Sequence, residues 1–200
     1  ALKNERIDPP PRYAYVAPTY TQAKDIAWGY LKHYSAPIPG IEKSESELWV
    51  RYPNGAQIRL YGADNYDRMR GLYFDGVTID EPAQIDPRAW PEVIRPTLAD
   101  DRGWATFIGT PKGRDWFYKI DQLPNGELDP EFFRLTLKAS ETGIILPEEL
   151  ESVRRGLTEE QYAQEFGCSF EAAVIGAYYG RLMAKAEEEG RITGVPYEPV

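Results

Sequence analysis

The sequence predicts an α/β protein built on a mostly parallel sheet with helices on both faces. Three observations support this class: apolar runs rich in β-branched residues recur along the chain, helical segments separate them, and several runs are continuously apolar. Continuous apolar runs are typical of strands buried on both faces. The chain has 200 residues with 42% hydrophobic content, which is enough for a sizeable core. One Cys and one His exclude an internal disulfide and a Cys/His zinc site.

The charge balance restricts the possible partners. The formal net charge is −9, and a surface that is acidic overall cannot wrap nucleic acid broadly, because phosphate neutralisation needs clustered Lys and Arg. Any DNA contact is therefore expected to be local. No stretch approaches the ~18 uncharged apolar residues that span a bilayer, and the N-terminus lacks the pattern of a signal peptide. We expect no membrane partner.

The first predicted elements are a strand, a helix and a hairpin. Tyr13–Val16 is a short β-rich run, and from Thr21 the apolar residues follow helical spacing, with Thr19 or Thr21 as the N-cap. A β-hairpin is predicted at about residues 48–61, where the runs Leu48–Tyr52 and Gln57–Tyr61 flank the turn PNGA. The Asn-Gly pair in that turn supplies the positive φ angles that a tight hairpin needs.

The middle of the chain predicts two more strands with a helix between them. The strand Gly71–Ile79 leads directly into two carboxylates, and the strand Ala105–Ile108 leads into the sequence GTPKG. Between them, Arg88–Leu98 is predicted as a helix that Pro91 and Pro96 interrupt.

The C-terminal half predicts mainly helices and one further strand. Thr158 followed three residues later by Gln161 resembles a capping box, which marks a helix start. The predicted elements are a helix at Trp116–Gln122, a strand at Phe132–Leu137, and helices at Pro147–Gly156, Thr158–Phe166 and Tyr178–Glu189.

Adjacent carboxylates follow one of the predicted strands, at the edge where open parallel sheets bind ligands. These are Asp80 and Glu81. A hydrophobic strand that ends in Asp-Glu is typical of nucleotide hydrolases, in which the Asp organises magnesium and the Glu orients or deprotonates the attacking water. The alternative is that Asp80 caps the next turn and Glu81 is solvated.

A small polar residue follows the next strand. Thr110, between Gly109 and Pro111, is suited to sense a γ-phosphate, although Gly and Pro also mark ordinary strand-to-turn junctions. Because this pattern follows a strand that ends in Asp-Glu, the two together are more specific than either alone.

Four segments, taken in order, resemble a known family. YVAPTYTQAKDIAW, DRMRGLYFDGVTIDEPAQI, FIGTPKGRDWFY and QYAQEFGCSFEAAVIGAYYG are similar to the ATPase domain of the large terminase subunit, the motor that packages DNA in tailed phages. The resemblance runs from about Arg12 to about Gly180. It implies a three-layer, P-loop NTPase-like fold of the ASCE type, with ATP and Mg²⁺ as cofactors.

The resemblance also implies roles for single residues. Asp80 matches the acidic residue that closes the Walker B strand and holds the metal, and Glu81 matches the catalytic carboxylate. Gly109 and Thr110 match the motif that couples nucleotide state to movement. Arg70 matches an arginine finger that reaches into a neighbouring subunit's site, although a surface arginine before a strand is the simpler interpretation.

The resemblance further implies partners and a place in the cell. These are double-stranded DNA, the portal protein, the small terminase subunit and a homo-oligomeric ring on the portal, in the host cytoplasm and transiently at the procapsid portal. Residues 1–170 are expected to be an ATPase domain whose N-terminal part is missing, and residues 171–200 a helix and linker toward an absent nuclease domain. No phosphate-binding loop with glycines and Lys-Ser/Thr occurs in the 200 residues, so the fragment alone is expected to be inactive.

Two other functions remain open from sequence. A helicase-like DNA translocase shows similar motifs in a similar order, and a catalytically inactive, truncated docking module would keep the fold without turnover.

Overall fold

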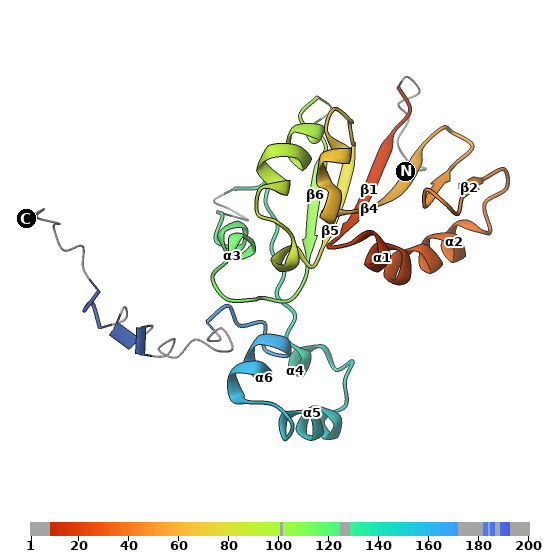
Figure 1. Ribbon diagram of the computed structural model, residues 1–200. Helices are drawn as coiled ribbons and strands as arrows, with labels where there is room; N and C mark the ends of the chain where they lie inside the picture. Colours follow the sequence, from red (N-terminus) through yellow and green to blue (C-terminus); the bar gives the residue numbers. More distant parts are fainter. Residues whose placement is uncertain are drawn as a thin grey trace, which may run out of the picture. The chain divides into compact units, whose positions relative to one another are not determined.

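The computed structural model describes residues 9–100, 102–124, 129–171, 182–183, 185–186 and 189–192. Within these residues the chain forms a mixed six-stranded sheet in the order β2-β3-β4-β1-β5-β6 (Figure 1). The pairs β4–β1, β1–β5 and β5–β6 are parallel, whereas β2–β3 and β3–β4 are antiparallel. The predicted mostly parallel sheet is therefore confirmed. The strands are β1 (Arg12–Ala17), β2 (Glu42–Ser44), β3 (Trp49–Arg51), β4 (Gln57–Gly62), β5 (Gly76–Asp80) and β6 (Trp104–Ile108).

The predicted hairpin is formed by β3 and β4. In its turn Gly55 has the predicted positive φ, +82°, whereas Asn54 does not have the positive φ that the sequence predicted. Gly55 donates a backbone hydrogen bond to the carbonyl oxygen of Tyr52 at 2.9 Å. The side-chain oxygen of Asn54 accepts a bond from the backbone N–H of Ala56 at 3.1 Å. Because β4 also pairs in parallel with β1, the hairpin extends the main sheet, and β2 adds a strand that the sequence did not predict.

A long helical segment follows β1, and Thr19 caps it. The Thr19 hydroxyl oxygen accepts a bond from the backbone N–H of Gln22 at 3.2 Å, so Thr19 is the N-cap and Thr21 lies inside the helix. The segment consists of α1 (Tyr20–Ala23), a π-helical stretch at Lys24–Trp28, and α2 (Gly29–Ser35).

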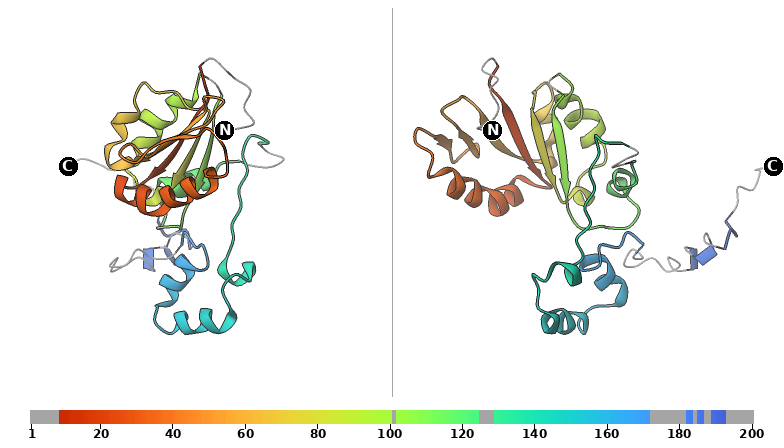
Figure 2. Two further views of the ribbon diagram at one scale, coloured as in Figure 1. Left: turned by 90° about the vertical axis from the view of Figure 1, so that its right-hand side faces the viewer. Right: turned by 180° about the vertical axis from the view of Figure 1, so that it is seen from behind.

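Helical layers cover both faces of the sheet (Figure 2). On one face, Ala23 and Trp28 from the long helical segment pack in a buried cluster with Leu60 of β4. On the other face, Trp90 packs edge-on against Phe107 of β6 with ring centroids 4.8 Å apart. Since neighbouring residues of a strand point to opposite faces, this arrangement covers β1 and β5 from both sides, whereas β3 and β4 are covered mainly on the face of the long helical segment.

The helix predicted at Arg88–Leu98 is divided into two tight turns. Trp90–Ile94 is a π-helical turn and Pro96–Leu98 is a 3₁₀ turn. Proline lacks a backbone N–H and its ring crowds the preceding turn, so the regular bonding ladder cannot continue through this stretch. The N–H of Arg95 instead bonds five residues back, to the carbonyl oxygen of Trp90 at 2.8 Å.

The strand predicted at Gly71–Ile79 begins five residues later, at Gly76. Gly71 has φ +77°, a left-handed conformation that an extended strand does not contain. The backbone N–H of Phe74 donates to Thr97 of the helical layer at 2.9 Å rather than to a neighbouring strand. The residues before β5 therefore form a turn.

The strand predicted at Phe132–Leu137 is wrong. The segment has no regular secondary structure, and the side chains of Phe133 and Leu135 are 86% and 63% exposed. Alternating apolar residues favour a strand only where an edge and an apolar layer are available to receive them.

Residues 1–109 and 110–200 form two compact units, and the second contains four short helices among its described residues. The predicted capping box is confirmed, because Thr158 and Gln161 exchange side-chain to backbone bonds at 2.8 and 3.2 Å. Of the helix predicted at Tyr178–Glu189, the structure describes residues 182, 183, 185 and 186 as helical, and most of the rest lies outside the described residues. No helix in the described part is long and apolar enough to cross a membrane. The four helices are α3 (Trp116–Asp121), α4 (Ala139–Thr142), α5 (Pro147–Arg154) and α6 (Glu159–Glu165).

We predict that Phe74→Ala lowers the free energy of unfolding by about 3–5 kcal/mol, because it leaves a cavity in a core where Phe74 is 2% exposed. The matched control is Phe133→Ala, which removes the same atoms from an 86% exposed side chain and is expected to change stability by less than about 0.5 kcal/mol. Urea denaturation followed by tryptophan fluorescence measures both. Equal losses in the two variants would contradict the assignment of Phe74 to the core.

Candidate functional site

Asp80 and Glu81 lie where β5 ends, beside the end of β6. Asp80 is in register with Ile108, and the backbone N–H of Glu81 donates to the carbonyl oxygen of Ile108 at 2.8 Å. Gly109 follows Ile108 directly. The two sequence motifs that were predicted to act together, Asp-Glu and Gly-Thr, therefore start from adjacent strand ends.

A tyrosine from the central strand holds Asp80. The hydroxyl of Tyr15 donates a short hydrogen bond to Oδ2 of Asp80. Tyr15 is in register with Thr78, so its ring lies on the same face of the sheet as Asp80, one diagonal step away. Burial raises the pKa of Tyr15 well above its ordinary value, and the bond to Asp80 raises that pKa further. The phenol therefore stays protonated and orients one carboxylate oxygen.

Glu81 has a backbone conformation that is rare for a residue with a side chain. Its φ and ψ are 48° and 53°, in the left-handed region, which costs about 1–2 kcal/mol for a residue other than glycine. Its Oε2 atom accepts a bond from Nε2 of Gln84 at 3.3 Å, and its carbonyl oxygen accepts one from the backbone N–H of Gln84 at 2.9 Å. Such strain persists where the surroundings hold it, most often at functional sites. It turns the Glu81 side chain out of the alternation of the strand.

The absence of a side chain at residue 109 allows β6 to approach Glu81 closely. A Cβ atom on Gly109 would lie 2.8 Å from Cδ of Pro82 and 3.1 Å from Cα of Glu81. Both distances are shorter than ordinary carbon contacts. A glycine is therefore required at position 109, because Pro82 and Glu81 leave no room for a side chain there. The sequence had indicated only that this glycine belongs to a turn.

The carboxylate pair suits magnesium rather than a fully protein-bound metal. Among the described residues no group of three or more His, Cys, Asp or Glu side chains is placed to hold a metal ion. Mg²⁺ is usually bound by one or two carboxylates together with waters and substrate phosphates, and Asp80 is a carboxylate of the kind that would hold it. Carboxylate oxygens at the carboxyl end of β5 therefore fit an ion that arrives with a phosphorylated ligand.

An acidic cavity of about 600 Å³ adjoins Glu81 through Gln84. Asp64 and Asp86 line it together with Thr19 and Gln22, the residues of the helix cap. Hydrogen bonds from Arg88 lower the pKa of Asp86 to about 2, so Asp86 is charged at neutral pH. The carboxylates of Asp64 and Asp86 make this cavity a poor site for a phosphate.

Two predicted site residues make no described contact with the carboxylates. Arg70 is exposed and pairs with Asp67 at 2.9 Å, and none of its described contacts is with Asp80 or Glu81. Thr110 directly follows Gly109 in the chain and is the first residue of the second compact unit.

Sequence reasoning did not identify Tyr15 and Gln84 as parts of the site. Gln84 had a detectable signal, since Pro82 starts a tight turn that places the residue three positions after Glu81 on the same side. Tyr15 had none, because its contact with Asp80 joins residues that are 65 positions apart.

Comparison with known families gives a consistent result. A family model described as "Terminase large subunit, T4likevirus-type, N-terminal" matches residues 5–181. The terminase large subunit of Thermus phage G20c is 38% identical over 90 residues, 44% of this chain and 17% of that protein. The terminase large subunit of Escherichia phage T5 is 27% identical over 176 residues, 82% of this chain and 38% of that protein. The chain thus spans less than half the length of these relatives.

Solved structures agree with the sequence comparison. The large terminase ATPase domain of Thermus phage P74-26 matches with a TM-score of 0.68 and 26% identity, covering 81% of this chain and 77% of that one. The large terminase of another thermophilic bacteriophage, in complex with ADP, matches with a TM-score of 0.62 and 14% identity, covering 82% and 42%. The second likeness concerns the fold alone. The chain has the P-loop NTPase-like fold of these ATPase domains.

We predict opposite effects of the same substitution at two glycines of the first unit. Gly109→Ala should lower the free energy of unfolding by about 1–3 kcal/mol, because the new methyl group overpacks against Pro82 and Glu81. Gly29→Ala should raise it by about 1 kcal/mol, because Gly29 lies inside the long helical segment and a methyl group there would meet nothing within 4 Å. Urea denaturation of the two variants and the parent measures both. A neutral Gly109→Ala would contradict the close approach of β6 to Glu81.

Proposed function

Because this chain belongs to the N-terminal family of the terminase large subunit, we propose that it is the ATPase motor domain that drives double-stranded DNA into a phage procapsid. The observation that carries the proposal is the Asp80–Glu81 pair at the carboxyl end of β5, packed against Gly109 of the next strand. The names of the similar structures support it, since they describe large terminase ATPase domains and complexes with ADP and ATP-γ-S.

Each residue of the pair has a separate task in this mechanism. Glu81 orients the attacking water and accepts its proton, while Gln84 fixes one of its two carboxylate oxygens. Asp80 holds the magnesium shell with the oxygen that Tyr15 leaves available. An Mg²⁺ ion held there would supply positive charge to offset that of the phosphates.

Gly109 and Thr110 provide a path from the site to the rest of the chain. The backbone bond from Glu81 to Ile108 ties the catalytic residue to the strand end that leads into both residues. Thr110 opens the second compact unit, so a change in its position on loss of the γ-phosphate passes directly along the chain to that unit. This is how hydrolysis would be coupled to DNA movement.

The proposal also covers the assembly. Copies of the protein would form a ring on the portal protein, with the small terminase subunit as a further partner, in the host cytoplasm and at the procapsid portal. Arg70 would act in trans in this ring, since its guanidinium is exposed and, among the described residues, its ion pair is with the nearby Asp67. The 200 residues contain no G-x-x-x-x-G-K-[ST] loop to anchor phosphates, so this part alone is expected to lack turnover.

We predict that Glu81→Gln in the complete protein lowers the rate of ATP hydrolysis by at least about 100-fold, because the amide cannot accept a proton from water. Nucleotide binding should be retained, since the shape of the side chain is unchanged. Phosphate release and ATP-γ-S binding measure the two quantities. Glu92→Gln, at an exposed position of the same unit, is the matched control and should hydrolyse ATP at the parent rate. Parental turnover by Glu81→Gln would overturn the catalytic assignment.

We predict that Arg70→Ala in the complete protein lowers ATP turnover by about 10³-fold or more, the usual contribution of an arginine finger. A mixture with Glu81→Gln, itself inactive, should recover part of the activity. An Arg70→Ala copy still has its own Glu81, and a Glu81→Gln neighbour still supplies Arg70. Arg68→Ala, which removes a neighbouring exposed arginine, should remain close to the parent. A mixture that co-assembles and stays inactive would exclude a contribution in trans.

A further inference from the structure

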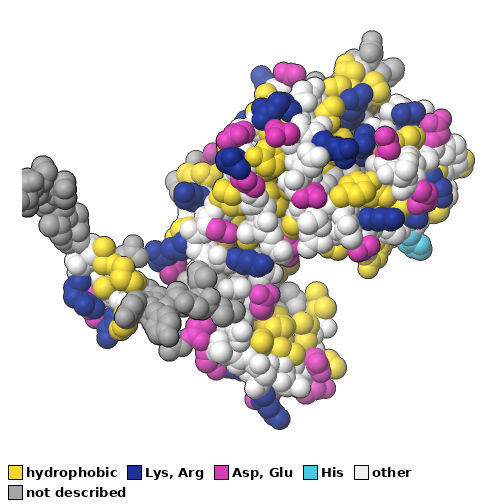
Figure 3. Space-filling view, viewed as in Figure 1, with side chains coloured by type: hydrophobic (Ala, Val, Ile, Leu, Met, Phe, Trp, Pro, Cys, Tyr) yellow, Lys and Arg dark blue, Asp and Glu magenta, His cyan; other side chains and the backbone are white. Residues whose placement is uncertain are grey.

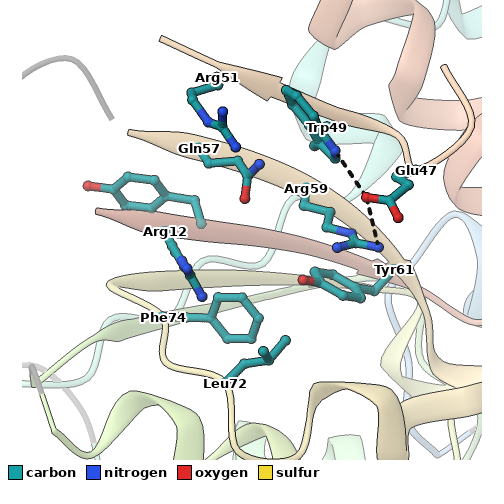
Figure 4. Close-up of a pocket in the computed structure, with 10 residues that line it drawn as sticks. Arg12, Glu47, Trp49, Arg51, Gln57, Arg59, Tyr61, Leu72 and Phe74 are labelled. Carbon is teal, nitrogen blue, oxygen red and sulfur yellow. Dashed lines mark hydrogen bonds and ion pairs between the residues drawn. The ribbon is translucent and has the colours of Figure 1, made fainter. Parts of the chain in front are cut away.

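A groove of about 300 Å³ lies over β1, β3 and β4, and neither Asp80 nor Glu81 is among the residues that line it (Figure 4). Three arginines line it: Arg12 from β1, Arg51 from β3 and Arg59 from β4. Neither the proposed catalysis by Asp80 and Glu81 nor the proposed coupling through Gly109 and Thr110 involves these arginines. The groove is therefore a separate feature of the molecule.

Strand register explains why the arginines gather. Gln57 is paired with Arg12 on one side and with Arg51 on the other, so these two arginines belong to one row across three strands. Arg59 lies two residues further along β4, which returns its side chain to the same face, opposite Trp49. The long helical segment packs on the other face, through residues such as Leu60. Within the described part of the chain, this section of the arginine-bearing face forms the groove.

Aromatic rings hold the three guanidinium groups in place. Stacking on a ring fixes the plane of a guanidinium group while its N–H edges remain available for hydrogen bonds. The distances from guanidinium carbon to ring centroid are 4.5 Å for Arg12 over Tyr73, 4.8 Å for Arg51 over Trp49 and 5.3 Å for Arg59 over Tyr61.

Three arginines and one carboxylate line the groove, and two further carboxylates lie just outside the lining, Glu42 beside Arg51 and Asp75, which accepts the backbone N–H of Arg12 at 2.8 Å. Among its lining residues the one carboxylate is Glu47, which accepts a bond from Trp49 at 3.2 Å and lies 3.8 Å from Arg59. Arg51 pairs at 3.1 Å with Glu42, which lies outside the lining, and Arg12 forms no ion pair with any described residue. Nε of Arg59 is buried without a hydrogen-bond partner in the described part of the chain.

We propose that this groove binds the phosphate backbone of double-stranded DNA. The choice of DNA rests on the proposed function, and the anionic chemistry rests on the groove itself. Guanidinium groups with fixed planes bind phosphate oxygens in pairs, and a row of them suits a ligand with regularly spaced charges.

A small contact of this kind fits the overall charge of −9. Lys and Arg side chains elsewhere are interspersed with Asp and Glu, and no broad basic surface is visible on the face drawn in Figure 3. Three phosphate contacts give an affinity that falls with salt with a slope of about −2.7 on logarithmic axes, well below that of a tightly held repressor. Weak contacts that carry no base readout allow DNA to slide.

The test measures duplex binding by the complete protein across a salt series, with fluorescence anisotropy of a labelled 30-base-pair DNA and no nucleotide. Arg12→Gln, Arg51→Gln and Arg59→Gln should each weaken binding by about tenfold and reduce the salt slope by about 0.9. Arg12→Lys should restore the slope, because it keeps the charge. Arg95→Gln, an exposed arginine of the same unit outside the groove, is the matched control and should bind like the parent.

The possible outcomes separate the groove from the proposed function. Parental slopes for all three variants, with unchanged urea midpoints, would overturn the groove as a DNA site. Loss of self-association in these variants, measured by analytical ultracentrifugation without DNA, would also overturn it if DNA binding were retained, because the occupant would then be an acidic part of a second copy. Reduced slopes in a protein that does not hydrolyse ATP would support the groove and refute the motor.

Discussion

The parallel pairing of β5 between β1 and β6 is the constraint on which the candidate site depends. It aligns three strand ends at one edge, so that Tyr15 reaches Asp80 and the carbonyl of Ile108 receives the backbone N–H of Glu81. A shift of β6 by one residue would move Gly109 away from Glu81 and bring a side chain into a space that has no room for one. The positions of both carboxylates therefore depend on register more than on their own sequence.

The same alternation gives the two faces of the sheet different chemistry. In β3 and β4, alternate side chains face opposite sides of the sheet. The even-numbered ones lie in the core under the long helical segment, and the odd-numbered ones line the polar groove. Val50 and Leu60 are fully or nearly fully buried, while their neighbours Arg51 and Arg59 face the groove. Binding chemistry and packing are thus separated by single positions along one strand. The proposed nucleotide site and the proposed DNA-binding groove can then share one sheet.

Local sequence patterns predicted the structure correctly where the backbone hydrogen bonds of the element are formed within the same few residues. The hairpin turn at Asn54 and Gly55 and the capping box at Thr158 and Gln161 satisfy their own backbone groups within a few residues, and both were predicted. The strand expected at Phe132–Leu137 needed a partner edge, which the fold does not provide among the described residues. The π-helical turn near Trp90 arises because prolines interrupt the regular ladder, and the sequence indicated the interruption without its geometry.

The sequence by itself determined the fold class, the hairpin, the position of Asp80 and Glu81 at a strand end, and the resemblance to terminase ATPase domains. These follow from composition, periodicity and short motifs, which act over a few residues. The tertiary structure alone decided the bond between Tyr15 and Asp80, the left-handed backbone of Glu81, the need for glycine at position 109, and the row of arginines on one face. Each of these depends on strand register between segments distant in sequence, because only register determines which side chains meet across a sheet.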